Sequence, residues 1–328
     1  SLPAIASNND AGGTEEHPKN PYIAVIAFDG DQIGKRLSGE LMPDVKDVVA
    51  DGLDRCVSGK RKLTPSYHAQ FSEALANFST SLSRRVVTKY KGLLVYAGGD
   101  DVLCVVPADK ALDCAADLRA VFRGDYALLS SDARHYDFGI TQPGFVLADE
   151  KYSLIVPGPS MDASCGIVIG HCKHPLQALV RESQVAERRA KSRYAKDKKD
   201  DYLGGAFALS LMKRSGEIIE WGAGWSQNAL AVYRDFTRKT DEEQLSGRFP
   251  YALADLLKPY RLSEKPQVNL KPVIATEFEH IQSQQAQVKG TRIDNALTYL
   301  KELSEDRLED FTNLFLASAF INRQRGDN

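Results

Sequence analysis

Two short acidic segments contain the residues of this chain best suited to chemistry. A Gly-Gly-Asp-Asp (GGDD) turn at residues 98–101 lies between the apolar runs 93–97 and 102–106, and Asp-Gly-Asp at 29–31 follows a third apolar run, 22–28. Neighbouring carboxylates repel one another, so such a pair ordinarily has a cation nearby. Mg²⁺ binds one or two carboxylates and completes its shell with substrate phosphates. The sequence therefore predicts a two-metal centre, the alternative being an ordinary Asp-rich turn.

A strand, a crossover helix and a hairpin are the elements expected to position these carboxylates. The near-continuous apolar run 22–28 predicts a buried strand, and the runs on either side of the GGDD turn predict a β-hairpin. Between them, apolar residues at helical spacing predict an amphipathic helix over 66–90. We expect this arrangement to place Asp29 beside Asp100 at neighbouring strand ends.

The expected elements up to about residue 220 follow the order β-α-β-β-α-β-α-β. After the hairpin come a helix over 108–123, a strand over 164–170, a helix over 175–195 and a strand over 205–212. This order is typical of the α+β class and of a ferredoxin-like palm, as in nucleotidyl cyclases and polymerases, extended by one helix and one strand.

Three segments are expected along the chain: a flexible N-terminal segment over 1–20, a palm domain over 21–222 and an all-α C-terminal bundle over 223–328. The division rests on a change of pattern after about Trp225. Helices are expected there over 226–239, 246–259, 272–286 and 292–323. One continuous domain is the alternative. Residues 125–162 are expected to be an inserted loop region that acts as a lid.

The bulk composition excludes few functions. With a net charge of −2 over 328 residues, the chain has no global signature of a nucleic-acid binder, so such contacts would need local patches. Its five cysteines form no Cys-x-x-Cys pair, which favours a reducing compartment. No segment is long and apolar enough to span a membrane and no signal peptide is visible, so we expect a cytoplasmic protein without a membrane partner.

The two acidic segments resemble one known family. Residues 28–39, containing Asp-Gly-Asp-Gln-Ile-Gly, and residues 95–103, containing GGDD, are similar to the large polymerase/cyclase subunit of type III CRISPR effector complexes, in particular its Cmr branch. Residues 166–171 and the Arg-Ser-Gly turn at 214–216 are similar as well. The resemblance implies synthesis of cyclic oligoadenylates from ATP with Mg²⁺ or Mn²⁺. It also implies the other effector subunits, a guide RNA and a target RNA as partners.

Asp29 and Asp100 are the expected metal ligands, both from the carboxylate argument and from the family match. The resemblance gives Asp101 the role of a further ligand or close support, so Asp100 and Asp101 are the expected catalytic pair. The carbonyl of Gly30 is expected to add an oxygen. Asp31 is expected to face into the turn.

The remaining site residues are expected to contact the nucleotide. Gly98 and Gly99 lack side chains and would let it approach the backbone. The resemblance indicates that Lys191 binds the triphosphate, where Lys acts as a point charge; a solvated helix face is the alternative. His171 fits a position near the base or ribose. A zinc site built on His171 and Cys172 is the competing interpretation, but no second cluster completes four ligands.

Two other functions compete with this interpretation. A GGDEF-like diguanylate cyclase shares the hairpin, although Val102 stands where that signature has Phe. A non-catalytic assembly subunit, docked through its helical tail, belongs to a different class. Full-length members of the family commonly carry an HD nuclease domain and a zinc module. The chain has neither a His-Asp dipeptide nor paired cysteines, so we expect no HD-type DNase activity from it.

Overall fold

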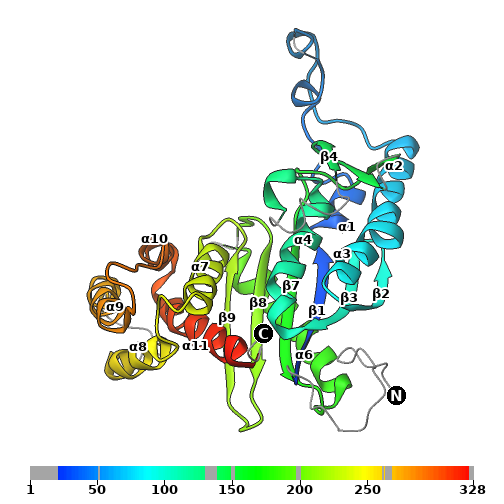
Figure 1. Cartoon of the computed structure of the whole chain (residues 1–328). Coiled ribbons are helices and arrows are strands. Elements are labelled where there is room, and N and C mark those ends of the chain that lie inside the picture. Colours follow the sequence, from blue (N-terminus) through cyan, green and yellow to red (C-terminus); the bar gives the residue numbers. More distant parts are fainter. Residues whose placement is uncertain are drawn as a thin grey trace, which may run out of the picture.

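The computed structural model describes residues 21–50, 52–129, 139–148, 152–196, 201–260, 262 and 268–324, so the expected flexible segment over 1–20 lies outside the described residues. A six-stranded sheet runs through the molecule in the order β2-β3-β1-β7-β8-β9 (Figure 1). Its strands are β1 (Tyr22–Gly30), β2 (Leu93–Gly98), β3 (Asp101–Pro107), β7 (Ala163–His171), β8 (Ala206–Met212) and β9 (Ile218–Gly224).

The first four strands have the order of a ferredoxin-like fold. The central strand β1 pairs antiparallel with β3 on one side and with β7 on the other, and β2 forms the edge hairpin with β3. Strand β8 pairs in parallel with β7, which requires a crossover connection, and α6 (Leu176–Arg189) supplies it. Strand β9 adds an antiparallel edge. The sheet confirms the predicted α+β palm with its appended helix and strand.

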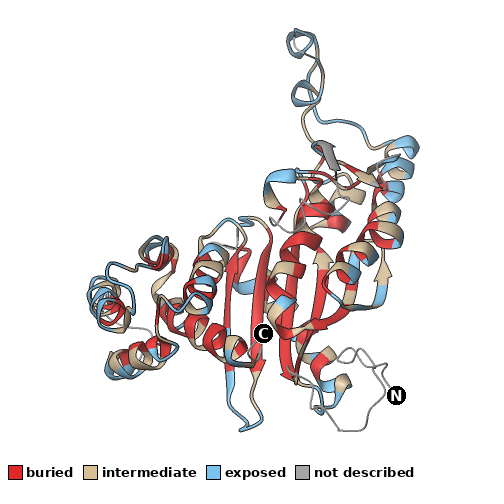
Figure 2. Cartoon of the chain, in the orientation of Figure 1, coloured by how far each residue is buried: buried red, intermediate tan, exposed pale blue. Residues whose placement is uncertain are grey.

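Alternate residues of the sheet face two helical layers. Ala24, Ile26 and Phe28 of β1 belong to the larger buried cluster, whereas Val25 packs with Leu179 of α6, because successive strand side chains point to opposite faces. Figure 2 shows the inner strands of the sheet, β1, β7 and β8, as mostly buried. The helices that contribute to the larger cluster in this half are α1 (Ile33–Leu37), α2 (Pro65–Asn77), α3 (Ser83–Lys89) and α4 (Ala111–Arg123).

The helix predicted over 66–90 is present as two α-helices joined by a π-helical turn. Helix α2 begins after Thr64, whose hydroxyl accepts a hydrogen bond from the Tyr67 backbone N–H at 3.2 Å, and Pro65 occupies the first turn. The turn η3 (Phe78–Leu82) then leads into α3. The apolar stripe that predicted the helix is the face that packs on the sheet.

Residues 125–162 are not a loop throughout. Their described part includes a small antiparallel sheet of three strands, β4 (Gly139–Gln142), β5 (Phe145–Ala148) and β6 (Tyr152–Ile155). The sequence prediction missed these strands because each has only four residues, too few to establish a period-2 pattern. The remainder of the segment lies partly outside the described residues, and its role as a lid stays a prediction.

In the part of the chain that the structure describes, five α-helices follow the sheet: α7 (Ala229–Asp241), α8 (Phe249–Leu257), α9 (Lys271–Gln285), α10 (Ala296–Glu302) and α11 (Leu308–Gln324). The single helix predicted over 292–323 is wrong, because Leu303 is extended at ψ 141° and separates α10 from α11. Phe315 of α11 lies at ring-centroid distances of 5.3–5.6 Å from four other aromatic rings, Phe236, Phe249, Phe278 and Phe311. Large aromatic side chains therefore build this core.

The larger buried cluster continues from the sheet into these helices. Helix α11 also contacts β9 directly, where the Asn313 side chain donates to the Glu220 carbonyl at 2.9 Å. The boundary between residues 222 and 223 stays a prediction. Within the described part of the chain, no helix combines the length and hydropathy needed to cross a bilayer.

Short helical turns lie in the connections. They are η1 (Val45–Asp47), η2 (Asp54–Cys56), η4 (Ala108–Lys110), η5 (Tyr126–Leu128), η7 (Lys258–Tyr260) and η8 (Glu305–Arg307), together with the π-helical turn η6 (Ala190–Tyr194) at the end of α6.

Candidate metal centre

The ends of β1 and β3 bring three aspartates together. Strand register pairs Phe28 with Val102, so the next residue of β1, Asp29, lies beside the turn that leads into β3. One carboxylate oxygen from each of Asp29, Asp100 and Asp101 lies within 4.8 Å of the others. The predicted juxtaposition of the two acidic segments is thus present, with an oxygen-only donor set that suits Mg²⁺ or Mn²⁺.

Two glycines allow the acidic segments to meet. A Cβ on Gly30 would lie 2.8 Å from the Cβ of Asp100, closer than real Cβ atoms approach, so only glycine fits between the two turns. Gly99 has φ +63°, a left-handed conformation that favours glycine, and a Cβ there would meet open space. Gly98 pairs with Asp101 across the hairpin, and its missing side chain leaves room for the Tyr96 hydroxyl. Nucleotide contact by Gly98 and Gly99 remains a prediction.

Lys191 reaches the same cluster from the helical layer of α6, which covers the face of β1 that Val25 and Asp29 share. Its ammonium forms an ion pair with Asp29 and another, at 2.8 Å, with Glu187, and lies 3.9 Å from Oδ1 of Asp31. Lys191 belongs to the π-helical turn η6, an irregularity that is frequent at functional sites. The structure therefore brings Lys191 to the aspartates, and its contact with a triphosphate stays a prediction.

The sequence analysis missed Glu187. It precedes Lys191 by four residues, a spacing that places two side chains on one face of a helix and could have indicated the pair. A glycine in β7 makes their position possible, because a Cβ on Gly166 would overlap the backbone of Ser183 and Glu187. Helix α6 thus packs directly on the sheet at this point.

Burial changes the titration of the site. It raises the pKa of the Glu187 carboxyl to about 7, and the charges of Asp31 and Asp101 act in the same direction. Burial likewise raises the pKa values of Asp100 and Asp101 above their usual range. It lowers the pKa of the Lys191 ammonium to about 8. The carboxylates of the site outnumber its one ammonium group, that of Lys191, and this excess of acidic groups favours binding of a further cation.

Asp31 lies outside the group of three aspartates, and its side chain points to β7 and Tyr202. It is 5% exposed, and its Oδ2 accepts hydrogen bonds from the Ser164 hydroxyl at 2.8 Å and the Tyr202 hydroxyl at 2.9 Å. Burial raises its pKa to about 6. Asp31 therefore fastens the acidic turn to β7 and to the segment before β8. No sequence pattern identifies Ser164 or Tyr202, because both contacts join distant parts of the chain.

His171 is not where the sequence analysis expected it. It pairs with Tyr22 at the start of β1, whereas Asp29 pairs with Ser164 at the other end of the same two strands. Seven residues of strand separate the two positions, about 23 Å at 3.3 Å per residue. The structure does not bring His171 to a nucleotide held by the aspartates. The three aspartates are also the only group of three or more candidate ligands among the described residues, so zinc ligation at His171 and Cys172 gains no support.

Comparisons with known proteins agree with this geometry. Residues 22–200 match the family model described as Cas10/Cmr2, second palm domain. Over 236 residues the chain is 33% identical to the CRISPR system Cmr subunit Cmr2 of Pyrococcus furiosus, an alignment that covers 70% of this chain and 23% of that protein. The chain thus spans about a quarter of the length of this curated relative.

Two solved structures share the fold. One is the apo state of a type III-B Cmr-beta complex, with a TM-score of 0.62, 15% identity, and coverage of 92% of this chain and 39% of that chain. The other is Cmr-beta bound to cognate target RNA, with a TM-score of 0.60, 14% identity, and coverage of 94% and 39%. The family match includes both acidic segments and more than half of the residues. The chain therefore belongs to the Cas10/Cmr2 family, in its Cmr branch, and its residues 22–200 correspond to the second palm domain of that family.

Proposed function

We propose that this chain holds two divalent ions, Mg²⁺ or Mn²⁺, at Asp29, Asp100 and Asp101 and joins ATP molecules into cyclic oligoadenylates, with release of pyrophosphate. The observation that carries the proposal is the convergence of the three carboxylates, within 4.8 Å, from two strand ends of a Cas10/Cmr2 palm. Asp29, Asp100 and Asp101 would hold the ions, which would supply activation of a ribose 3′-hydroxyl and charge stabilisation for its in-line attack on an α-phosphate.

The side chains of this site have different proposed roles. Asp29 comes from β1 and Asp100 and Asp101 from the hairpin, so two rigid strand ends fix the ligand positions. In this structure Lys191 neutralises part of the aspartate charge. Its ammonium becomes available to the triphosphate once another cation takes over that role, and Glu187 keeps the lysine close to the site.

The partners proposed for the chain are the other subunits of a type III effector complex, its guide RNA and a target RNA. The solved relatives are Cmr-beta complexes, one of them bound to cognate target RNA. Because the chain spans only part of those proteins, we expect the assembled complex to be the active form. Target RNA would then control ATP turnover through the complex.

The test is incubation with ATP or GTP and Mg²⁺ or Mn²⁺, alone and in the assembled complex with target RNA, with products resolved by mass spectrometry. Cyclic oligoadenylates are expected. Replacing both turn aspartates, Asp100→Asn with Asp101→Asn, is expected to lower their yield at least about a hundredfold. The exposed Asp54→Asn serves as the matched control.

Each other outcome would contradict the proposal. Cyclic di-GMP from GTP would identify a diguanylate cyclase. The absence of product in the complex as well as in the isolated chain would identify an assembly subunit. Unchanged turnover in the double variant would show that the reaction occurs elsewhere.

A further inference from the structure

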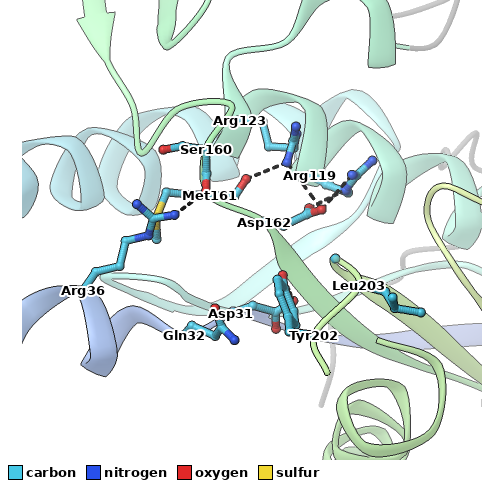
Figure 3. A pocket seen from close by; sticks show the side chains of 11 residues that line it. Asp31, Gln32, Arg36, Arg119, Arg123, Ser160, Met161, Asp162, Tyr202 and Leu203 are labelled. Atoms are coloured by element: carbon cyan, nitrogen blue, oxygen red, sulfur yellow. Dashed lines mark hydrogen bonds and ion pairs between the residues drawn. The ribbon is translucent and has the colours of Figure 1, made fainter. Parts of the chain in front are cut away.

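A second polar site borders the acidic turn. A cavity of about 320 Å³ is lined by Asp31 and Gln32 of that turn but by none of the three clustered aspartates (Figure 3). Three arginines from two helices contribute to its wall, Arg36 of α1 and Arg119 and Arg123 of α4. The acidic cluster and this cavity are therefore neighbours with opposite chemistry.

The arginines are held in place by protein contacts. Asp162 accepts two hydrogen bonds from Arg119, at 2.6 and 2.9 Å, and lies 3.4 Å from Nη1 of Arg123. Arg123 also donates to the Met161 carbonyl at 2.6 Å, and Arg36 donates to the Ser160 carbonyl at 2.5 Å. These contacts, drawn as dashed lines in Figure 3, fix the guanidinium groups before any ligand arrives. Such preorganisation lowers the entropic cost of binding.

The positive charge of the cavity exceeds its negative charge. Three guanidinium groups face two carboxylates, and Asp31 already accepts two hydrogen bonds from Ser164 and Tyr202. A guanidinium has five N–H donors, more than the contacts above use. Spare, oriented arginine donors are the groups that recognise phosphate.

An apolar groove adjoins the arginine cavity. It has a volume of about 260 Å³ and shares Arg36, Ser160 and Met161 with the cavity. Tyr67 and Phe71 of α2 are among its walls, with their rings stacked at a centroid distance of 6.0 Å. A positively charged cavity beside an aromatic groove offers one place for a phosphate and another for a flat apolar group.

We propose that the cavity and groove together bind a nucleotide, with its phosphate on Arg36 and Arg123 and its base against Tyr67 and Phe71. The ligand is either a free nucleotide or one residue of an RNA strand, since both present a phosphate next to a base. The site is separate from the acidic cluster and uses none of its ligands. The inference therefore does not depend on the proposed cyclase activity.

The test measures binding to the whole chain in EDTA, with Asp100→Asn and Asp101→Asn present so that the acidic cluster and its metals take no part. The probes are adenosine 5′-monophosphate, followed by calorimetry, and a fluorescein-labelled hexa-adenylate RNA, followed by anisotropy. Arg36→Ala is expected to weaken binding at least about tenfold, since it removes a charged hydrogen-bond donor. Arg36→Lys keeps the positive charge, so we expect this variant to bind the probes more tightly than Arg36→Ala and less tightly than the parent.

Arg181→Ala is the matched control, because it removes the same charge from an exposed site on α6. Circular dichroism verifies that each variant is folded. Binding of the mononucleotide identifies a free nucleotide as the ligand, and binding of the RNA alone identifies a strand. Equal affinity of Arg36→Ala and its parent for both probes, or an equal loss in Arg181→Ala, would overturn the proposal. Neither result depends on whether ATP is turned over.

Discussion

The acidic cluster and the arginine cavity border the same turn but balance their charges differently. Although burial acts to raise it, the pKa of Asp162 in the cavity is lowered, because Arg119 donates two hydrogen bonds to this carboxylate. Asp100 in the cluster has no cation among its described contacts, and burial raises its pKa. Asp162 is thus paired within the protein, whereas Asp100 has no such cationic partner among the described residues. The first arrangement favours folding and the second favours metal binding.

Removing the central carboxylate of the cavity, that of Asp162, is expected to lower the free energy of unfolding more than any other change considered below. Asp162→Ala leaves Arg119 and Arg123 without their shared partner in a half-buried site, and loss of one member of such a pair costs about 3–5 kcal/mol. The free energy of unfolding in urea measures this loss. The exposed Asp54→Ala should change it by less than about 0.5 kcal/mol. A similar small change for Asp162→Ala would show that the cavity does not stabilise the fold.

Crowding the contact between the two acidic turns is expected to have the next largest effect. Gly30→Ala places a methyl group against Asp100, and overpacking of this kind costs about 1–3 kcal/mol. Pushing Asp100 away from Asp29 should also weaken Mn²⁺ binding, followed by calorimetry. Gly34→Ala is the control, since a Cβ there meets nothing within 4 Å. If both variants bound Mn²⁺ as the parent does, the close approach of the turns would not matter for the site.

The charge of Glu187 makes the cluster side of the turn sensitive to pH. Its pKa is raised by burial from the ordinary 4.5 to about 7, so the folded chain binds more protons between these values. Stability is therefore lost as pH rises from about 4.5 to about 7. In EDTA, Glu187→Gln should reduce this loss by about 1–2 kcal/mol, measured by urea unfolding at pH 5 and pH 8. Glu182→Gln, on the same helix, is the control. An identical pH dependence in Glu187→Gln and the parent would contradict the argument.

The hydrogen bond that joins the turn to the segment before β8 is expected to contribute least. Tyr202→Phe removes one of two donors to Asp31 and should cost about 1 kcal/mol in thermal unfolding. Ser164→Ala, which removes the other donor, provides the comparison within the same contact. If Tyr202→Phe lowered stability more than Asp162→Ala does, the hydrogen bond to Asp31 would matter more for folding than the ion pairs of Asp162, contrary to our expectation.

Local patterns predicted the elements of the fold and the centre of the site. The apolar run before Asp29 and the runs around the GGDD turn are long enough to predict strands, and these strands pair as expected. The four-residue strands β4–β6 gave no such signal, and the break at Leu303 lies inside an apolar helical pattern. The prediction for His171 was wrong because the apolar pattern identifies the residues of a strand but does not indicate which end of that strand lies near the ligand. Asp162, Ser164 and Tyr202 act through contacts between distant segments, which no local pattern reveals.

We propose that the aspartates, and not the neighbouring charges, bind the divalent ions. Calorimetric titration of Mn²⁺ into the parent chain, Asp100→Asn and Arg36→Ala distinguishes these two possibilities. Loss of a ligand should lower the affinity at least about tenfold in Asp100→Asn, whereas Arg36→Ala, altered in the cavity alone, should bind Mn²⁺ as the parent does. Equal affinity of Asp100→Asn and the parent would contradict the assignment of the metal centre.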